Sequence, residues 1–131
     1  MMSPLDQRSA LQAADDGPLL EARSPTSTCK VTSAETNGAF TLLEYTVPPH
    51  FRGPPPHLHV GTTHTFYIVD GLLVFTRDDE TIMASRGASI LVLPHVTHAC
   101  WNPTAAPATF LEWLSPGGGE SCLPERLSDA D

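Results

Sequence analysis

The amino-acid sequence predicts a single all-β domain. Thirteen prolines and nine glycines separate short apolar runs along the 131 residues, and short runs between turn signals are typical of β-sandwiches and β-barrels. Apolar residues make up 40% of the chain and charged residues 17%, which supplies enough apolar surface for one core and argues against a disordered chain. We therefore expect two facing sheets that close into one barrel.

The expected barrel covers residues 18–116. Residues 1–17 are expected to form an N-terminal tail that could hold one short helix, and residues 117–131 a polar, glycine-rich C-terminal tail. Asp70-Gly71 separates two apolar runs and predicts a β-hairpin turn, as does Asp78-Asp79. The strands expected from the apolar runs are, in order, 22–24, 28–33, 39–47, 56–59, 63–70, 72–77, 80–84, 89–93, 97–102 and 108–115.

Charge and cysteine content limit the expected partners and location. Fifteen acidic residues against seven basic ones give a formal charge of −8, and an acidic surface repels phosphate backbones and anionic lipid. We therefore expect neither nucleic acid nor a membrane as a partner. The sequence has no basic segment followed by an apolar run and nothing near the roughly 20 apolar residues that span a bilayer, which favours a cytoplasmic protein. Cys29, Cys100 and Cys122 are widely spaced without a C-x-x-C pattern, so we expect reduced thiols.

Three of the six histidines lie close together in the segment GPPPHLHVGTTHTFYIVDG. Side chains two residues apart on a strand share a face, so His57 and His59 are expected to point the same way. If residues 60–62 form a turn, His64 on the next strand faces this pair. His98 opens a late strand and joins the three histidines if the sheet rolls up.

Converging imidazoles indicate a metal site. Imidazole nitrogen binds Zn, Ni, Fe, Mn and Cu, and burying several imidazoles without partners costs about 1–3 kcal/mol for each unsatisfied group. We therefore predict one divalent transition metal per chain. The alternative is that these histidines lie on a solvated face or are satisfied within the core. His95 is a candidate acid or base at the rim of the pocket, with a plain surface position as its alternative.

The spacing of these residues resembles the two sequence motifs of the cupin superfamily. The resemblance spans residues 39–116 and implies a small double-stranded β-helix barrel of the jelly-roll type, with His57, His59, His64 and His98 as metal ligands. The matching positions are Gly53, His57, His59, His64 and Gly71 in the first motif and Gly87, Pro94, His98 and Asn102 in the second.

The chain departs from the cupin pattern at three positions. Gly53 lies four residues before His57 where the pattern has six, and Val96 lies where a glycine is usual. His64 occupies the position of the usual glutamate, which is expected to remove a negative charge from the metal and a proton acceptor from the pocket. Four neutral ligands leave a divalent ion its full charge, which favours Lewis-acid chemistry.

Among cupins, the chain most resembles the small metal-dependent cyclases of bacterial aromatic polyketide biosynthesis. This resemblance implies aldol cyclisation and aromatisation of a poly-β-ketone, delivered on an acyl carrier protein, with zinc favoured because it is redox-silent. It also implies a homodimer, since sheet edges need covering. Two alternatives stay open: a quercetinase-like or diketone-cleaving dioxygenase that uses Fe, Ni or Cu, and a cupin that binds or isomerises small metabolites.

Overall fold

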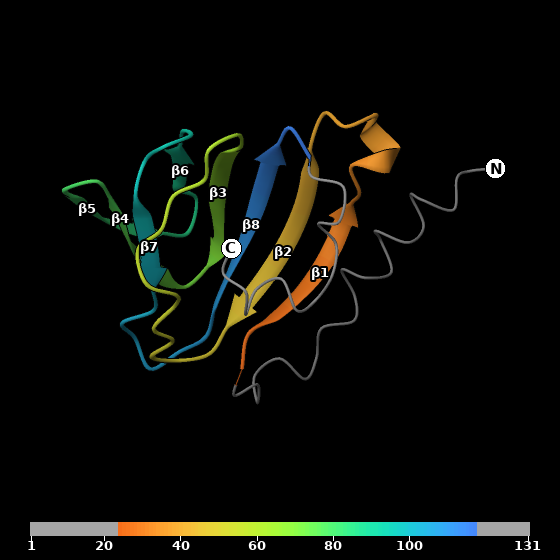
Figure 1. Ribbon diagram of the computed structural model, residues 1–131. Coiled ribbons are helices and arrows are strands. Elements are labelled where there is room, and N and C mark those ends of the chain that lie inside the picture. The colour runs from red at the N-terminus through yellow and green to blue at the C-terminus, as the bar shows by residue number, and fades with distance from the viewer. Residues whose placement is uncertain (1–23, 118–131) are drawn as a thin grey trace.

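The computed structural model describes residues 24–117 and shows an all-β chain (Figure 1). The predicted tail 1–17, most of the expected strand 22–24 and residues 118–131 lie outside the described residues. Within 24–117 no helix is long and apolar enough to cross a membrane. The described elements are β1 (Thr26–Val31), the 3₁₀ turn η2 (Ala34–Thr36), β2 (Thr41–Val47), β3 (Thr63–Asp70), β4 (Leu72–Arg77), β5 (Glu80–Ser85), β6 (Ser89–Val92), β7 (His98–Trp101) and β8 (Ala108–Ser115).

The strands form two antiparallel sheets that enclose one core, which confirms the predicted fold class. The larger sheet has the order β1-β2-β8-β3-β6 and the smaller one β5-β4-β7. Figure 1 shows β3, β8, β2 and β1 side by side, with β4, β5 and β7 to the left of β3. Phe66 of β3 contacts Phe75 of β4 from the opposite sheet, with ring centroids 5.0 Å apart. Burying an aromatic ring of this kind stabilises the fold by about 1.5–3 kcal/mol. Because the two rings come from different sheets, their contact helps to hold the sheets together.

The expected strand 56–59 is wrong. This segment is a loop in which only His57 forms a β-bridge, with His98. Residues 54–56 are all proline and have no N–H to donate to a ladder. The backbone of the segment therefore pairs with β7 at one residue only.

The predicted hairpin at Asp70-Gly71 is also wrong, whereas the one at Asp78-Asp79 is confirmed. β3 pairs with β6 and β8, while β4 pairs with β5 and β7. Gly71 is therefore a corner at which the chain passes from one sheet to the other. It has φ 92°, and a Cβ at this position would lie 2.8 Å from the Cα of Ala108, so the corner needs glycine.

Asn102 ties together the loops at residues 48–51 and 104–106. Its side chain is 1% exposed, and Nδ2 donates to the carbonyls of Pro48 at 3.0 Å and Ala106 at 2.7 Å. Its Oδ1 accepts from the backbone N–H of Thr104 at 2.9 Å. The Asn102 amide itself donates to the Phe51 carbonyl at 2.8 Å, which anchors the loop that leads to His57.

The expectation of reduced thiols fails for one cysteine. Cys29 is disulfide-bonded, whereas Cys100 is free and half-buried; Cys122 lies outside the described part of the chain. Spacing along the sequence carries no information on which cysteines the fold brings together.

Candidate metal centre

His57 and His98 are held together by their backbones. The His57 amide donates to the His98 carbonyl at 3.0 Å, and the His98 amide donates back at 2.8 Å. Gly53, with φ 71°, allows this approach, because a Cβ there would lie 2.1 Å from the Cys100 carbonyl oxygen of β7. The two imidazole centroids are 4.6 Å apart. Close packing of a glycine against β7 thus positions a loop histidine beside a strand histidine.

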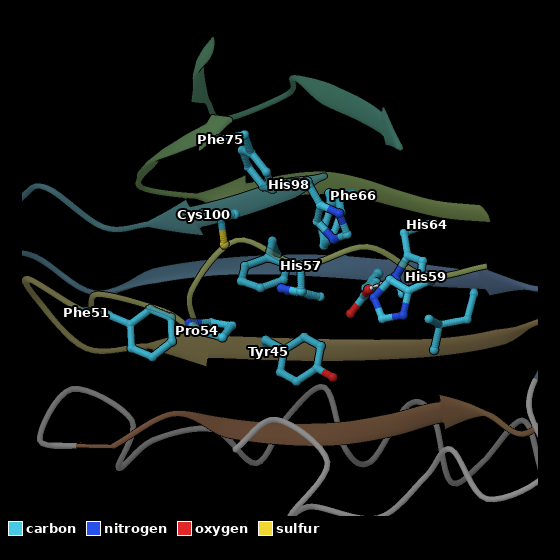
Figure 2. A pocket seen from close by; sticks show the side chains of 14 residues that line it. Tyr45, Phe51, Pro54, His57, His59, His64, Phe66, Phe75, His98 and Cys100 are labelled. Atoms are coloured by element: carbon cyan, nitrogen blue, oxygen red, sulfur yellow. Dashed lines mark hydrogen bonds and ion pairs between the residues drawn. The ribbon is translucent and has the colours of Figure 1, made fainter. Parts of the chain in front are cut away.

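His59 and His64 complete the cluster from the other side. The His59 carbonyl accepts a hydrogen bond from the His95 amide at 2.7 Å, which anchors the loop. His64 lies on β3, is 5% exposed, and stacks on the His59 ring with centroids 4.1 Å apart. Figure 2 shows all four histidine side chains in one cavity. The structure therefore brings together the four histidines that the sequence singled out.

Two of these imidazoles are oriented by backbone carbonyls. His57 Nδ1 lies 2.9 Å from the Pro55 carbonyl oxygen, and His98 Nδ1 lies 3.2 Å from that of Val96. A carbonyl oxygen only accepts, so Nδ1 carries the proton and Nε2 carries the lone pair. Such hydrogen bonds from the second ring nitrogen are typical of metal-binding histidines.

His64 is oriented by a carboxylate. Its Nδ1 lies 2.5 Å from Oε2 of Glu112, a β8 residue that is 9% exposed. Its Nε2 is buried and has no hydrogen-bond partner among the described residues. A buried nitrogen without a partner costs about 1–3 kcal/mol, so a ligand at Nε2 would remove this penalty.

Sequence reasoning missed Glu112. The β8 sequence ATFLEWLS alternates, and this period places Glu112 on the same inward face as Phe110 and Leu114. A charged residue on a core-facing position was the available signal. The expectation that His64 leaves the pocket without a carboxylate is therefore wrong, because β8 supplies one.

The donor set fits a divalent transition metal. The ligand nitrogens of His57, His59 and His98 lie within 4.8 Å of one another. His64 is not part of that group, but its ring stacks on the His59 ring with centroids 4.1 Å apart. The pKa of His98 is lowered, first by burial and further by the neighbouring imidazoles His57 and His64, against an opposing hydrogen bond to Val96. A lowered pKa keeps the imidazole neutral, which is the form that binds metal. The four-histidine ligand set stays a prediction.

The histidines line a small cavity whose other walls are mostly apolar. Its volume is about 90 Å³, compared with about 300–1,000 Å³ for pockets that enclose drug-sized ligands. Burial, helped by the negative charge of Glu112, raises the pKa of the Cys100 thiol in this wall to about 12, so the thiol stays protonated. The aromatic residues of the wall are Tyr45, Phe51, Phe66, Phe75 and Phe110.

His95 and His50 lie away from this cavity. Both side chains are exposed and both residues have positive φ, and neither lines the cavity. His95 contributes its backbone amide to the site through His59. A role for the His95 side chain in proton transfer stays a prediction that the geometry does not support.

Several solved structures are similar to this fold. KdgF from Halomonas sp. is 14% identical with a TM-score of 0.65, covering 74% of this chain and 83% of its own. TT1209 from Thermus thermophilus is 19% identical with a TM-score of 0.65, covering 82% and 93%. The polyketide cyclase RemF from Streptomyces resistomycificus is 22% identical with a TM-score of 0.62, covering 72% and 66%.

Sequence comparison identifies the family. No curated protein matches the chain in sequence. Residues 43–114, more than half of the chain, match the family model described as "Cupin domain". This range contains both histidine motifs and Glu112. The chain therefore belongs to the cupin domain family.

Proposed function

We propose that the chain is a metal-dependent polyketide cyclase that closes rings in a poly-β-ketone by aldol condensation and dehydration. The observation that carries the proposal is the convergence of four histidines on a cavity whose remaining wall is largely aromatic. Such a wall suits a flat, carbon-rich ligand, and a few polar groups orient it. The fold shared with the RemF polyketide cyclase supports the same interpretation.

In this proposal His57, His59 and His98 hold one divalent ion, with His64 as the fourth ligand. Bound there, the ion supplies a Lewis acid for a ketone oxygen. Zinc is favoured because it is redox-silent.

The size of the cavity limits how much of the substrate enters. About 90 Å³ holds a short segment, such as one 1,3-dicarbonyl unit, whereas a complete poly-β-ketone needs several times this volume. We propose that the reacting segment enters and that the rest of the chain, with its acyl carrier protein, stays outside. The wall then selects which segment reacts by excluding the others.

The aldol step balances without added reagents. A methylene between two carbonyls loses a proton, its carbon forms a bond to a second ketone carbon, and the oxygen of that ketone gains a proton. Dehydration then removes this oxygen as water together with the remaining methylene hydrogen. The chain contributes orientation through the walls at Phe66, Phe75 and Phe110 and keeps bulk water from the reacting carbons.

A diketone-cleaving dioxygenase is the second candidate, and the buried carboxylate of Glu112 favours it. From the sequence, His64 in place of the usual glutamate was expected to remove a proton acceptor from the pocket. Glu112 returns one to the same cavity. The dioxygenase needs O₂ and Fe, Ni or Cu and breaks a carbon–carbon bond, whereas the cyclase forms one.

The two candidates separate in one experiment. The zinc form is incubated under nitrogen with a poly-β-ketone made by a minimal polyketide synthase, and products are identified by mass spectrometry. We expect cyclised product from the parent chain and from the control His50→Ala, and only spontaneous products from His57→Ala. Product formation that needs O₂, or Fe, Ni or Cu in place of zinc, supports the dioxygenase. Binding without turnover under either condition supports a small-metabolite-binding cupin.

The proposal includes a homodimer. β6 is an edge strand of the larger sheet, and Leu91 on it and Leu93 after it are both exposed. Among the described strands nothing pairs with the outer side of β6, although Arg77 Nη1 donates to the Leu91 carbonyl at 2.8 Å. An edge strand with exposed leucines is suited to pairing with a second copy. Light scattering should give about twice the 14.1 kDa of the chain; a monomer at micromolar concentration contradicts it.

A further inference from the structure

We propose that Glu112 is a positioning residue for the metal centre: it holds His64 Nδ1 so that Nε2 is presented to the ion. The inference rests on the proposed metal centre of the same site and is independent of the reaction that the centre performs. In the usual cupin pattern a glutamate ligand brings a negative charge directly to the metal. Here Glu112 brings that charge indirectly, through its contact with His64.

The strand register places the two side chains together. His64 pairs with Leu114 and Phe66 pairs with Glu112 between β3 and β8, so His64 and Glu112 are diagonal neighbours on one face. Diagonal neighbours are within reach of long side chains. The Nδ1–Oε2 distance of 2.5 Å shows that the two are in direct contact, and both side chains are nearly buried.

The position of Glu112 is poorly explained by stability alone. Its neighbours on the inward face of β8, Phe110 and Leu114, are buried and apolar. Burying a carboxylate and its partner costs desolvation that their attraction often only balances, and apolar residues of similar size are frequently as stable. A role at the adjacent unpartnered Nε2 of His64 accounts for the buried charge.

His64 also differs from its neighbours in how it is oriented. The carbonyls of Pro55 and Val96 fix the Nδ1 protons of His57 and His98, and a side-chain substitution cannot remove a backbone carbonyl. His64 depends on a side chain. Without it, the ring can turn or carry its proton on Nε2, and that nitrogen then cannot bind metal.

The first test measures zinc affinity of the full chain by competition with a chromophoric chelator. Glu112→Gln keeps the shape and an acceptor oxygen but loses the charge, and we expect affinity to fall about tenfold; for Glu112→Leu, which removes the acceptor, the fall approaches a hundredfold. Glu44→Gln is the matched control, because Glu44 lies on β2 in an ion pair with Lys30, and its affinity should equal that of the parent. Parental affinity in Glu112→Gln overturns the inference.

The second test asks whether Glu112 acts through His64. In a His64→Ala background, Glu112→Gln should change zinc affinity by less than about twofold, because coupled residues give non-additive effects. A full tenfold loss in that background means that Glu112 binds the ion itself or acts elsewhere, and overturns the proposal. The visible spectrum of the cobalt form should shift in Glu112→Gln and stay unchanged in Glu44→Gln. Far-UV circular dichroism confirms that each variant is folded.

These readouts separate the inference from the proposed function. If zinc affinity follows the expected pattern but no cyclised product forms, the cyclase proposal fails and the role of Glu112 stands. If cyclised product forms but Glu112→Gln binds zinc as the parent does, the role of Glu112 fails and the cyclase stands.

Discussion

Gly53→Ala should damage the metal centre through the backbone, and Gly87→Ala is its matched control. Both glycines have positive φ, 71° and 91°, so alanine in the left-handed conformation costs about 1–2 kcal/mol at either position. At Gly87 nothing lies within 4 Å of the added Cβ, whereas at Gly53 the Cβ would lie 2.1 Å from the Cys100 carbonyl oxygen. The difference between the two variants therefore isolates the clash.

The clash sets the expected magnitudes. The Gly53 loop must move by about 1 Å to restore a normal contact, and overpacking of this kind costs about 1–3 kcal/mol more. At about 4–8 °C per kcal/mol, the midpoint of thermal unfolding should fall by about 4–16 °C for Gly87→Ala, and by a further 4 °C or more for Gly53→Ala. Metal–ligand distances vary by only about 0.2 Å, so the displacement of His57 should also weaken zinc binding at least tenfold in Gly53→Ala. Zinc binding should not change in Gly87→Ala.

The assays are thermal unfolding of the metal-free proteins by circular dichroism and chelator competition for zinc. Equal zinc affinities and equal midpoints for the two variants would refute the argument that close packing of Gly53 on β7 positions His57.

Three further outcomes are expected. His98→Ala should lose zinc binding while keeping the β-rich far-UV spectrum, with His50→Ala as the exposed control; undiminished affinity, measured by calorimetry, would remove His98 from the ligand set. Folding lowers the pKa of His98 below its ordinary 6.5, so the folded state holds fewer protons than the unfolded state. The metal-free protein should therefore lose stability as pH falls below about 6.5. Thermal unfolding between pH 8 and 5 should show a smaller loss of stability in His98→Gln, and an equal pH dependence in both proteins would contradict this. Raising the pKa of Cys100 from 9.0 to about 12 lowers its thiolate population about a thousandfold. Iodoacetamide should therefore modify Cys100 only after unfolding. Rapid modification of Cys100 in the folded chain, detected by mass spectrometry, would disprove this expectation.

The sequence alone was enough to predict the fold class and to single out the four histidines that meet in the cavity. Strand alternation is a local property: it puts Phe66 and Ile68 on the same face as His64, and all three are buried. The spacing of the histidine motifs likewise indicated which imidazoles would meet. The period of a strand accounts for β3, whereas the strand assumed at 56–59 is a loop, so the meeting of His57, His59 and His98 depends on contacts between loop and sheet.

Tertiary structure decided how the chain connects these parts and what surrounds them. Asp70-Gly71 has the local chemistry of a hairpin, but the partners of β3 and β4 lie in different sheets, and pairing between distant strands cannot be read from a turn. The loop at His57 is held by Gly53 against β7, a contact that the sequence spacing does not reveal. Glu112 lies 48 residues from His64. Only the β3–β8 register brings that carboxylate to the imidazole, because contacts between residues distant in sequence depend on how the whole sheet closes.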